Sequence, residues 1–201
     1  MAFTYFFRDP DVLEQIAKAV IENFLNLPLI KIWDAGCATG EEAYSLAMIL
    51  AEKLTANQLE KLRILATDHE ENANFGDMVT QGIYPSHAAT GCPRFDLLRK
   101  YCYPADKPNH IQVIEQLRSL LIYKRHNLLS LNPPDKEFHV ILCKNVLLHF
   151  NEESQANVVN MFHQALIPGG ILALDQSQTV PQKVSSMFRP TPNCSSLYEK
   201  N

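Results

Sequence analysis

Residues 29–44 hold a short apolar segment, a turn of small residues and the start of an amphipathic segment, and this order constrains the fold more than any other part of the chain. The apolar segment ends at Asp34, and Gly36 and Gly40 lie in the turn that follows. Glycine permits a tight turn and a close approach of the backbone to a ligand. Strand, glycine turn and helix in this order indicate the first crossover of a nucleotide-binding α/β domain.

The charge of this turn indicates which ligand it accepts. Phosphate groups bind at helix N-termini because free N–H groups and the helix dipole attract anions. Here Glu41 and Glu42 occupy the first helical turn, and the glycine turn contains no Lys or Arg. This arrangement disfavours a pyrophosphate and favours a cation or ribose hydroxyls, which points to S-adenosylmethionine. The alternative is an ordinary strand-to-helix turn in which the two acids complement the helix dipole.

Composition sets the broad class of the protein. A chain of 201 residues fits one domain, and a net charge of −4 gives no electrostatic reason to expect nucleic acid as a partner. The five cysteines form no C-x-x-C pair and the first residues lack the features of a signal peptide, so we expect a cytoplasmic protein. No apolar segment approaches membrane-spanning length, so we expect no membrane insertion. The histidines show no metal-like spacing, so we expect no metal site.

Apolar segments alternate with helical patterns along the chain. Strands are predicted at 62–68, 120–125, 138–143 and 171–174, the last after a turn at 168–170. Helices are predicted from Asp9-Pro10 onward, at 70–79, at 95–101 and at 152–166. The alternation predicts an α/β fold with a doubly wound, mostly parallel sheet and helices on both faces, of the Rossmann-like type.

Polar residues follow the apolar strands. These residues are Asp34, Asp68, Asn127 and the pair Lys144 and Asn145. Right-handed crossovers put the C-terminal ends of parallel strands on one edge of a sheet. We therefore expect these residues to gather at that edge, where open α/β sheets bind their ligands.

Motifs from about residue 4 to residue 198 form an ordered series. They are TYFFRD at 4–9, the glycine turn within 33–47, ATD at 66–68, GIY at 82–84, NLL at 127–129, CKNV at 143–146 and PGG at 168–170. This series resembles the catalytic domain of chemotaxis receptor glutamate methyltransferases of the CheR type. The resemblance implies a class I methyltransferase fold that uses S-adenosylmethionine.

The resemblance also implies roles for residues at the methyl-transfer end of the site. Thr4 and Arg8 would lie against the cofactor and the methyl-transfer site. Glu42 would face the methionine part of the cofactor, and Lys144 and Asn145 would lie near the same end. Without the motif, Arg8 would be interpreted as a solvated charge before a helix.

The remaining implied contacts concern the nucleoside. Asp68 would accept hydrogen bonds from the ribose hydroxyls, for which an ionised acid is a natural acceptor. Asn127 and Leu128 would flank the adenine, and Gly36 would let the backbone approach the cofactor. Taken alone, Asp68 could be a helix cap and Asn127 a turn residue.

The chain also departs from the family pattern. The family's R-N-V-x-I-Y-F reads KNVLLHF at 144–150, so Lys144 replaces an arginine and His149 replaces the active-site tyrosine. We assign His149 to the catalytic site, where it could be a base, a hydrogen-bond donor or a structural residue. Residues 83–118 would hold the family's small receptor-docking subdomain. The N-terminal helical domain of family members has no counterpart in residues 1–201.

These observations predict an S-adenosylmethionine-dependent O-methyltransferase that releases S-adenosylhomocysteine. Its expected acceptor is a glutamate side chain of a chemoreceptor or of another protein. One alternative is a methyltransferase of the same fold that acts on a small molecule or a different protein. The other is a non-catalytic module that binds S-adenosylmethionine.

Overall fold

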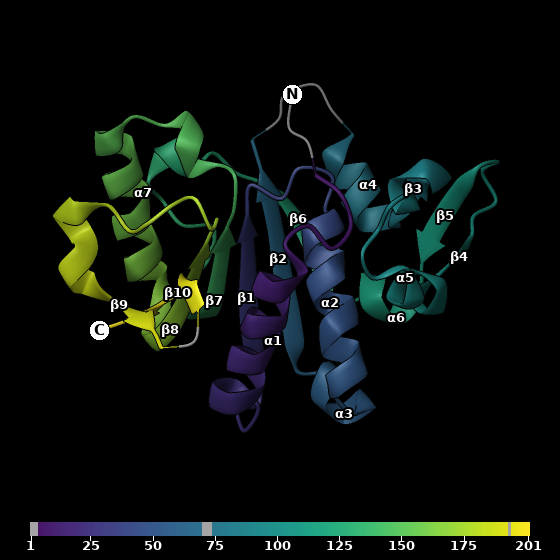
Figure 1. Ribbon diagram of the computed structural model, residues 1–201, viewed down its shortest axis with the longest axis horizontal. Coiled ribbons are helices and arrows are strands. Elements are labelled where there is room, and N and C mark those ends of the chain that lie inside the picture. Colours follow the sequence, from purple (N-terminus) through teal and green to yellow (C-terminus); the bar gives the residue numbers. More distant parts are fainter. Residues whose placement is uncertain (1–3, 70–73, 193) are drawn as a thin grey trace.

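The computed structural model describes residues 4–69, 74–192 and 194–201, and a seven-stranded sheet lies at its centre (Figure 1). The strands of this sheet are β1 (Ile30–Ala35), β2 (Leu62–Asp68), β6 (Leu121–Arg125), β7 (Phe138–Cys143), β8 (Leu166–Leu174), β9 (Phe188–Thr191) and β10 (Cys194–Lys200). Their spatial order is β6-β2-β1-β7-β8-β10-β9. The first five strands pair in parallel, and β10 runs antiparallel to both β8 and β9. The predicted doubly wound, mostly parallel sheet is therefore confirmed.

Helices cover both faces of this sheet (Figure 1). The α-helices of the described residues are α1 (Pro10–Phe24), α2 (Glu41–Lys53), α3 (Ala56–Leu59), α4 (Phe75–Gln81), α5 (Phe95–Tyr101), α6 (Glu115–Arg118) and α7 (Glu152–Ala165). Alternation along β1 decides which face each side chain joins. Ile30 and Ile32 pack with residues of α1 and α2, whereas Trp33 and Ala35 pack with residues of α7. Two hydrophobic clusters result, one on each face.

The strand order changes direction next to β1. From β1 the chain continues to β2 and β6 on one side, and it then returns to β7 and β8 on the other side. A crevice forms at such a switch point, outside the C-terminal ends of the strands. The sheet therefore places the ends of β1, β2 and β7 around one location.

Most predicted elements match the structure, and two differ from it. The predicted helix at 70–79 is observed as Phe75–Gln81, and residues 70–73 lie outside the described residues. The predicted turn at 168–170 lies instead within β8, which begins at Leu166. Gly169 takes a positive φ of 73° there, and the pairing of β7 with β8 shifts register next to it. The glycines thus make an irregularity inside a strand rather than a turn before it.

A second, three-stranded sheet lies within residues 83–118. It consists of β3 (Ile83–Pro85), β5 (His110–Val113) and β4 (Cys102–Pro104), with β5 in the middle. This sheet, α5 and α6 form the unit at the right of Figure 1. The Tyr84 hydroxyl on β3 donates a hydrogen bond of 2.8 Å to the carbonyl of Thr39, which ties the small sheet to the glycine turn.

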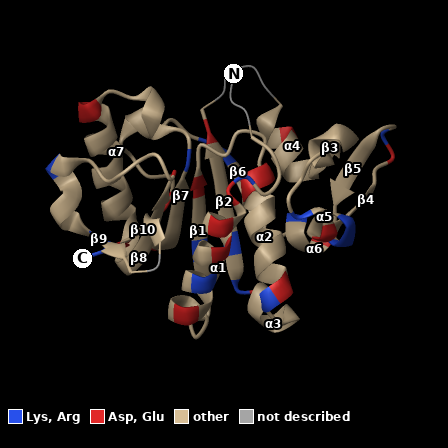
Figure 2. Cartoon of the chain, in the orientation of Figure 1, with Lys and Arg blue, Asp and Glu red and all other residues tan. Residues whose placement is uncertain are grey.

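Charged residues of both signs are spread over the elements rather than gathered on one side (Figure 2). Within the described part of the chain, no helix has the length and apolar character needed to cross a bilayer.

Gly36 has two independent reasons to be a glycine. Its φ of +92° lies in the left-handed region, and a Cβ at this position would overlap with Cγ2 of Val146. We expect Gly36→Ala to lower the free energy of unfolding by about 2–5 kcal/mol, the sum of backbone strain and overpacking. Urea unfolding measures this loss.

Gly91 provides the matched control for this prediction. Its φ is +73°, and a Cβ there would meet nothing within 4 Å. Gly91→Ala should therefore lower the free energy of unfolding only through backbone strain, by about 1–2 kcal/mol. Equal losses in the two variants would contradict the steric part of the explanation.

Candidate active site

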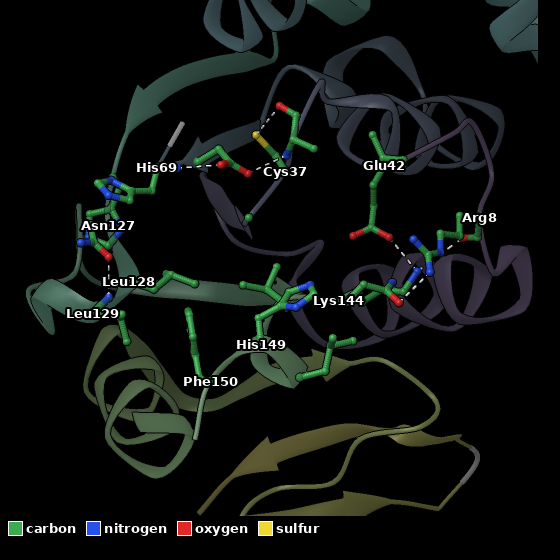
Figure 3. Close-up of a pocket in the computed structure, with 18 residues that line it drawn as sticks. Arg8, Cys37, Glu42, His69, Asn127, Leu128, Leu129, Lys144, His149 and Phe150 are labelled. Atoms are coloured by element: carbon green, nitrogen blue, oxygen red, sulfur yellow. Dashed lines mark hydrogen bonds and ion pairs between the residues drawn. The ribbon is translucent and has the colours of Figure 1, made fainter. Parts of the chain in front are cut away.

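A cavity of about 590 Å³ lies at the C-terminal ends of β1, β2 and β7 (Figure 3). Its size falls within the range of about 300–1,000 Å³ that is typical of small-molecule sites. All ten residues that the sequence predicted for the site line this cavity. They are Thr4, Arg8, Gly36, Glu42, Asp68, Asn127, Leu128, Lys144, Asn145 and His149. Residues separated by up to 145 positions in the sequence therefore meet at one location.

A buried ion pair lies at one end of the cavity. Nζ of Lys144 is 2.7 Å from Oε1 of Glu42 and 3.3 Å from Oδ2 of Asp9, and the Lys144 side chain is 0% exposed. Burial favours the neutral amine, but the charges of Glu42 and Asp9 outweigh this effect. The pKa of Lys144 consequently lies above its ordinary value. Glu42 is therefore held by a charged lysine at the start of α2.

Arg8 reaches the cavity from the segment before α1. Its Nη2 donates a hydrogen bond of 2.7 Å to Oδ1 of Asn145 (Figure 3). Asn145 has a φ of 60°, in the left-handed region that asparagine tolerates. The segment is anchored by buried Phe6 and Phe7, and the backbone N–H of Phe7 donates to Oγ of Ser45 at 2.8 Å. The guanidinium is thus positioned by both its own partner and the packing of its neighbours.

Asp68 ends β2 and bonds to two backbone groups. Its Oδ2 accepts from the N–H of Ala38 at 2.9 Å, and its Oδ1 accepts from the N–H of His69 at 2.7 Å. Each carboxylate oxygen can accept more than one hydrogen bond. The capping role and the role of a ligand acceptor are therefore compatible in the same side chain.

Asn127 and Leu128 follow β6 at the opposite end of the cavity from Arg8 (Figure 3). Oδ1 of Asn127 accepts from the N–H of Leu129 at 2.9 Å, which opens the short helix η2 (Leu128–Ser130). Leu128 is buried. The pair combines an amide with an apolar surface, which suits a planar heterocycle.

His149 ends the short helix η3 (Leu147–His149). It is exposed, and it lines the cavity together with Leu148, which is 50% exposed, and Phe150 (Figure 3). This end of the cavity is therefore accessible to a second molecule.

Sequence reasoning missed several contributors to the site. Residues without a predicted role also line the cavity: Cys37, Ala38, His69, His126, Leu129, Val146, Leu148 and Phe150. Each is one or two positions from a predicted residue, which is the signal that could have found them. Among the described residues, no group of three His, Cys, Asp or Glu side chains could hold a metal ion.

Glu41 was interpreted from the sequence only as a first-turn acid. It is buried, and its Oε2 accepts from Oγ1 of Thr39 at 2.6 Å. Burial raises the pKa of Glu41 to about 7, although the bond from Thr39 acts in the opposite direction. This carboxyl group therefore titrates near neutral pH.

The donor set of the cavity fits S-adenosylmethionine. The Glu42 carboxylate suits the cationic amino group, and the Asp68 carboxylate suits ribose hydroxyls. Gly36 lines the cavity, and a Cβ at this position would overlap with Val146, so only glycine lets the backbone come close to a ligand here without moving that side chain. The acidic first turn of α2 is unsuited to a pyrophosphate.

Comparisons with known proteins agree with this geometry. Residues 2–195 match the family described as CheR methyltransferase, SAM binding domain, in which SAM is S-adenosylmethionine. A chemotaxis protein methyltransferase of Borreliella burgdorferi is 34% identical over 185 residues, which are 88% of this chain and 64% of that protein. A 104.1 kDa protein of Rhodobacter capsulatus is 33% identical over 184 residues, which are 89% of this chain and 19% of that protein. The chain thus spans less than two thirds of the length of these relatives.

A solved structure supports the fold. The crystal structure of DszA carbon methyltransferase has a TM-score of 0.52 at 15% sequence identity, over 85% of this chain and 36% of that chain. At this identity the likeness concerns the fold alone.

The family match covers nearly the whole chain and includes the glycine turn and the strand ends that surround the cavity. S-adenosylmethionine is accordingly the cofactor of this domain. The chain belongs to the CheR methyltransferase family through its S-adenosylmethionine-binding domain.

Proposed function

We propose that this chain transfers the methyl group of S-adenosylmethionine to the carboxylate of protein glutamate side chains, as in the adaptation of chemotaxis receptors. The observation that carries the proposal is the placement of Arg8 and Asn145 beside the Glu42–Lys144 pair in one cavity. A relative of similar sequence is named a chemotaxis protein methyltransferase, which supports a protein acceptor. A cytoplasmic location fits this acceptor and the scattered cysteines.

The proposal assigns the cofactor contacts to both ends of the cavity. Asp68 accepts hydrogen bonds from the ribose hydroxyls, while Asn127 and Leu128 hold the adenine. Glu42 binds the charged amino group of the methionine end, and Lys144 holds the Glu42 carboxylate in place there. When bound, the cofactor supplies an electrophilic methyl group on its sulfonium.

Arg8 has the central role in aiming the acceptor. A glutamate carboxylate is ionised at neutral pH and needs no general base to become a nucleophile. It needs a group that fixes its orientation, and the planar guanidinium fork binds a carboxylate through two parallel hydrogen bonds. Asn145 holds that fork at 2.7 Å, and Thr4 lines the same end of the cavity. Positioning of this kind supplies much of the rate enhancement in a displacement reaction.

His149 supports a second candidate function. An imidazole can accept a proton near neutral pH, which would help a hydroxyl or amine acceptor and would not help a carboxylate. His149 is exposed and lines the cavity, so it could contact such an acceptor. The second candidate is therefore a methyltransferase with a hydroxyl or amine acceptor on a small molecule or another protein.

Labelling with a tritiated methyl group tests the proposed function. The purified chain should transfer label to proteins of a chemotactic bacterial extract, and the label should be released by mild alkali as expected for methyl esters. Alkali-stable label, or label confined to small molecules, would contradict the glutamate assignment.

Arg8→Ala should abolish most of the transfer while leaving the affinity for S-adenosylhomocysteine within a few-fold. Arg8→Lys should restore only part of it, because a point charge cannot reproduce the planar fork.

Asp68→Ala should weaken binding of S-adenosylhomocysteine by about ten- to a hundredfold, since a hydrogen bond to a charged acceptor contributes about 1.5–3 kcal/mol. Titration calorimetry measures the dissociation constant. Asp77, which is exposed on α4, gives the control variant Asp77→Ala, for which we expect an unchanged constant. An unchanged dissociation constant in Asp68→Ala would show that Asp68 only accepts hydrogen bonds from the backbone N–H groups of Ala38 and His69 and does not bind the ligand.

The pH dependence of the rate separates the two acceptor classes. With a carboxylate acceptor, His149→Tyr should preserve or improve the rate between pH 6 and about 8, because nothing need be deprotonated. With a hydroxyl or amine acceptor, the rate should rise with pH, because a general base acts in its unprotonated form, and His149→Tyr should abolish that rise.

Glu41 needs its own control in this experiment, because its pKa of about 7 lies in the same range. A pH-dependent limb that persists in His149→Tyr and disappears in Glu41→Gln belongs to Glu41. A limb that disappears only in His149→Tyr would establish the second candidate and refute the carboxylate acceptor.

A further inference from the structure

A buried carboxyl group that has no part in the proposed mechanism lies next to the candidate active site. Asp34, near the C-terminal end of β1, is 1% exposed, and its Oδ2 has no hydrogen-bond partner among the described residues. Buried polar atoms without partners are rare in folded proteins, and each one calls for an explanation. Asp34 shares the face of β1 that carries Ile30 and Ile32, so it points toward α2.

Ionisable groups from several elements face Asp34. They are Glu42 on α2, Lys144 after β7, Asp68 at the end of β2, Cys37 in the glycine turn and Cys143 on β7. Lys144 is the one cation among these described groups, and its ammonium is already shared between Glu42 at 2.7 Å and Asp9 at 3.3 Å. A charged Asp34 would be a third carboxylate competing for one buried cation.

The electrostatic balance agrees with this geometry. Burial is the main cause, and the charge of Glu42 adds to it, so the pKa of the Asp34 carboxyl lies well above its ordinary value. Lys144 and the backbone N–H of Ala43 favour the ionised form without reversing the shift.

We propose that Asp34 is held as an uncharged carboxylic acid and acts as a positioning residue, which leaves Lys144 bound to Glu42 and keeps the Glu42 carboxylate in place at the methionine end of the cavity. Ionisation of Asp34 would draw the Lys144 ammonium toward the new carboxylate and displace Glu42. The role of Glu42 toward the cofactor rests on the proposed function, whereas the protonation of Asp34 can be tested without any ligand.

Stability as a function of pH gives the first test. An unfolded aspartate loses its proton near pH 3.9, roughly, whereas the folded chain keeps the proton on Asp34 to higher pH. Between the pKa of Asp34 in the unfolded chain and its higher pKa in the folded chain, the folded state binds one more proton than the unfolded state. The free energy of unfolding therefore falls as pH rises in this range. The isosteric variant Asp34→Asn has no such proton. The unfolding equilibrium constant of the wild type should therefore rise relative to that of Asp34→Asn by about tenfold per pH unit above about pH 5.

Asp77→Asn, at an exposed position on α4, is the matched control and should keep the wild-type slope. Parallel curves for the wild type and Asp34→Asn would overturn the proposal.

Infrared spectroscopy of the ligand-free protein tests the same protonation without the Asp34→Asn variant, so it does not depend on whether that variant folds. At about pH 6, two units above the ordinary pKa of an aspartate, Glu41→Gln should show the carbonyl stretch of a protonated carboxylic acid, since Glu41 itself is then absent. Absence of this band in Glu41→Gln would also overturn the proposal.

Calorimetry with S-adenosylhomocysteine tests the positioning role of Asp34. The measurement is made in the Glu41→Gln variant, because the pKa of Glu41 is about 7 and its titration would otherwise add to the pH dependence. The affinity should fall by about tenfold per pH unit once Asp34 ionises, and Asp34→Asn should remove this dependence while retaining the affinity measured at low pH. Identical pH profiles with and without Asp34→Asn would refute the positioning role. No binding by the wild type at any pH would instead refute the proposed function, and the stability and infrared results would still decide the protonation of Asp34.

Discussion

The buried contact between Lys144 and Glu42 is the interaction on which the site depends. It joins the residue after β7 to the first turn of α2, and the same ammonium also contacts Asp9 at the start of α1 and the backbone carbonyl of Arg8 at 3.4 Å. Removing one partner from a buried pair costs about 3–5 kcal/mol, because the other charge is left uncompensated. One lysine side chain therefore links three segments that are distant in the sequence: the end of β7, the start of α2 and the start of α1.

The sequence predicted the elements whose signals are local. The apolar segments 62–68 and 138–143 correspond to β2 and β7 at every position, and residues 95–101 form α5 as expected. The antiparallel pair β9 and β10 was not predicted, because its pairing with β8 depends on contacts between distant segments. The start of β8 was placed too late, since glycines within a strand resemble a turn when only the sequence is read.

The sequence predicted which residues meet at the site better than it predicted their protonation states. Polar residues after parallel strands must meet at one edge of the sheet, so the residue types placed Asp68, Asn127, Lys144 and Asn145 at the cavity. Asp34, which the same reasoning placed there, is buried and is not among the residues that line the cavity. The assignments of Thr4, Arg8, Glu42 and His149 came from the resemblance to the family. The protonation states of Asp34 and Glu41 depend on how completely other segments bury them, and no spacing in the sequence reports that burial. The same limit applies to Asp9, whose contact with Lys144 follows from the path of the chain before α1.

The close contact at the glycine turn also restricts how this sequence can change over evolution. Positions 36 and 146 are far apart in the chain, yet the space that a Cβ at position 36 would need is filled by the branched side chain of Val146. A chain that replaced the glycine would need a smaller residue at position 146 first, and it would still retain the backbone strain of a positive φ. A substitution at position 36 is therefore sterically possible only after one at position 146, whereas this contact does not prevent residue 146 from becoming smaller while position 36 stays glycine.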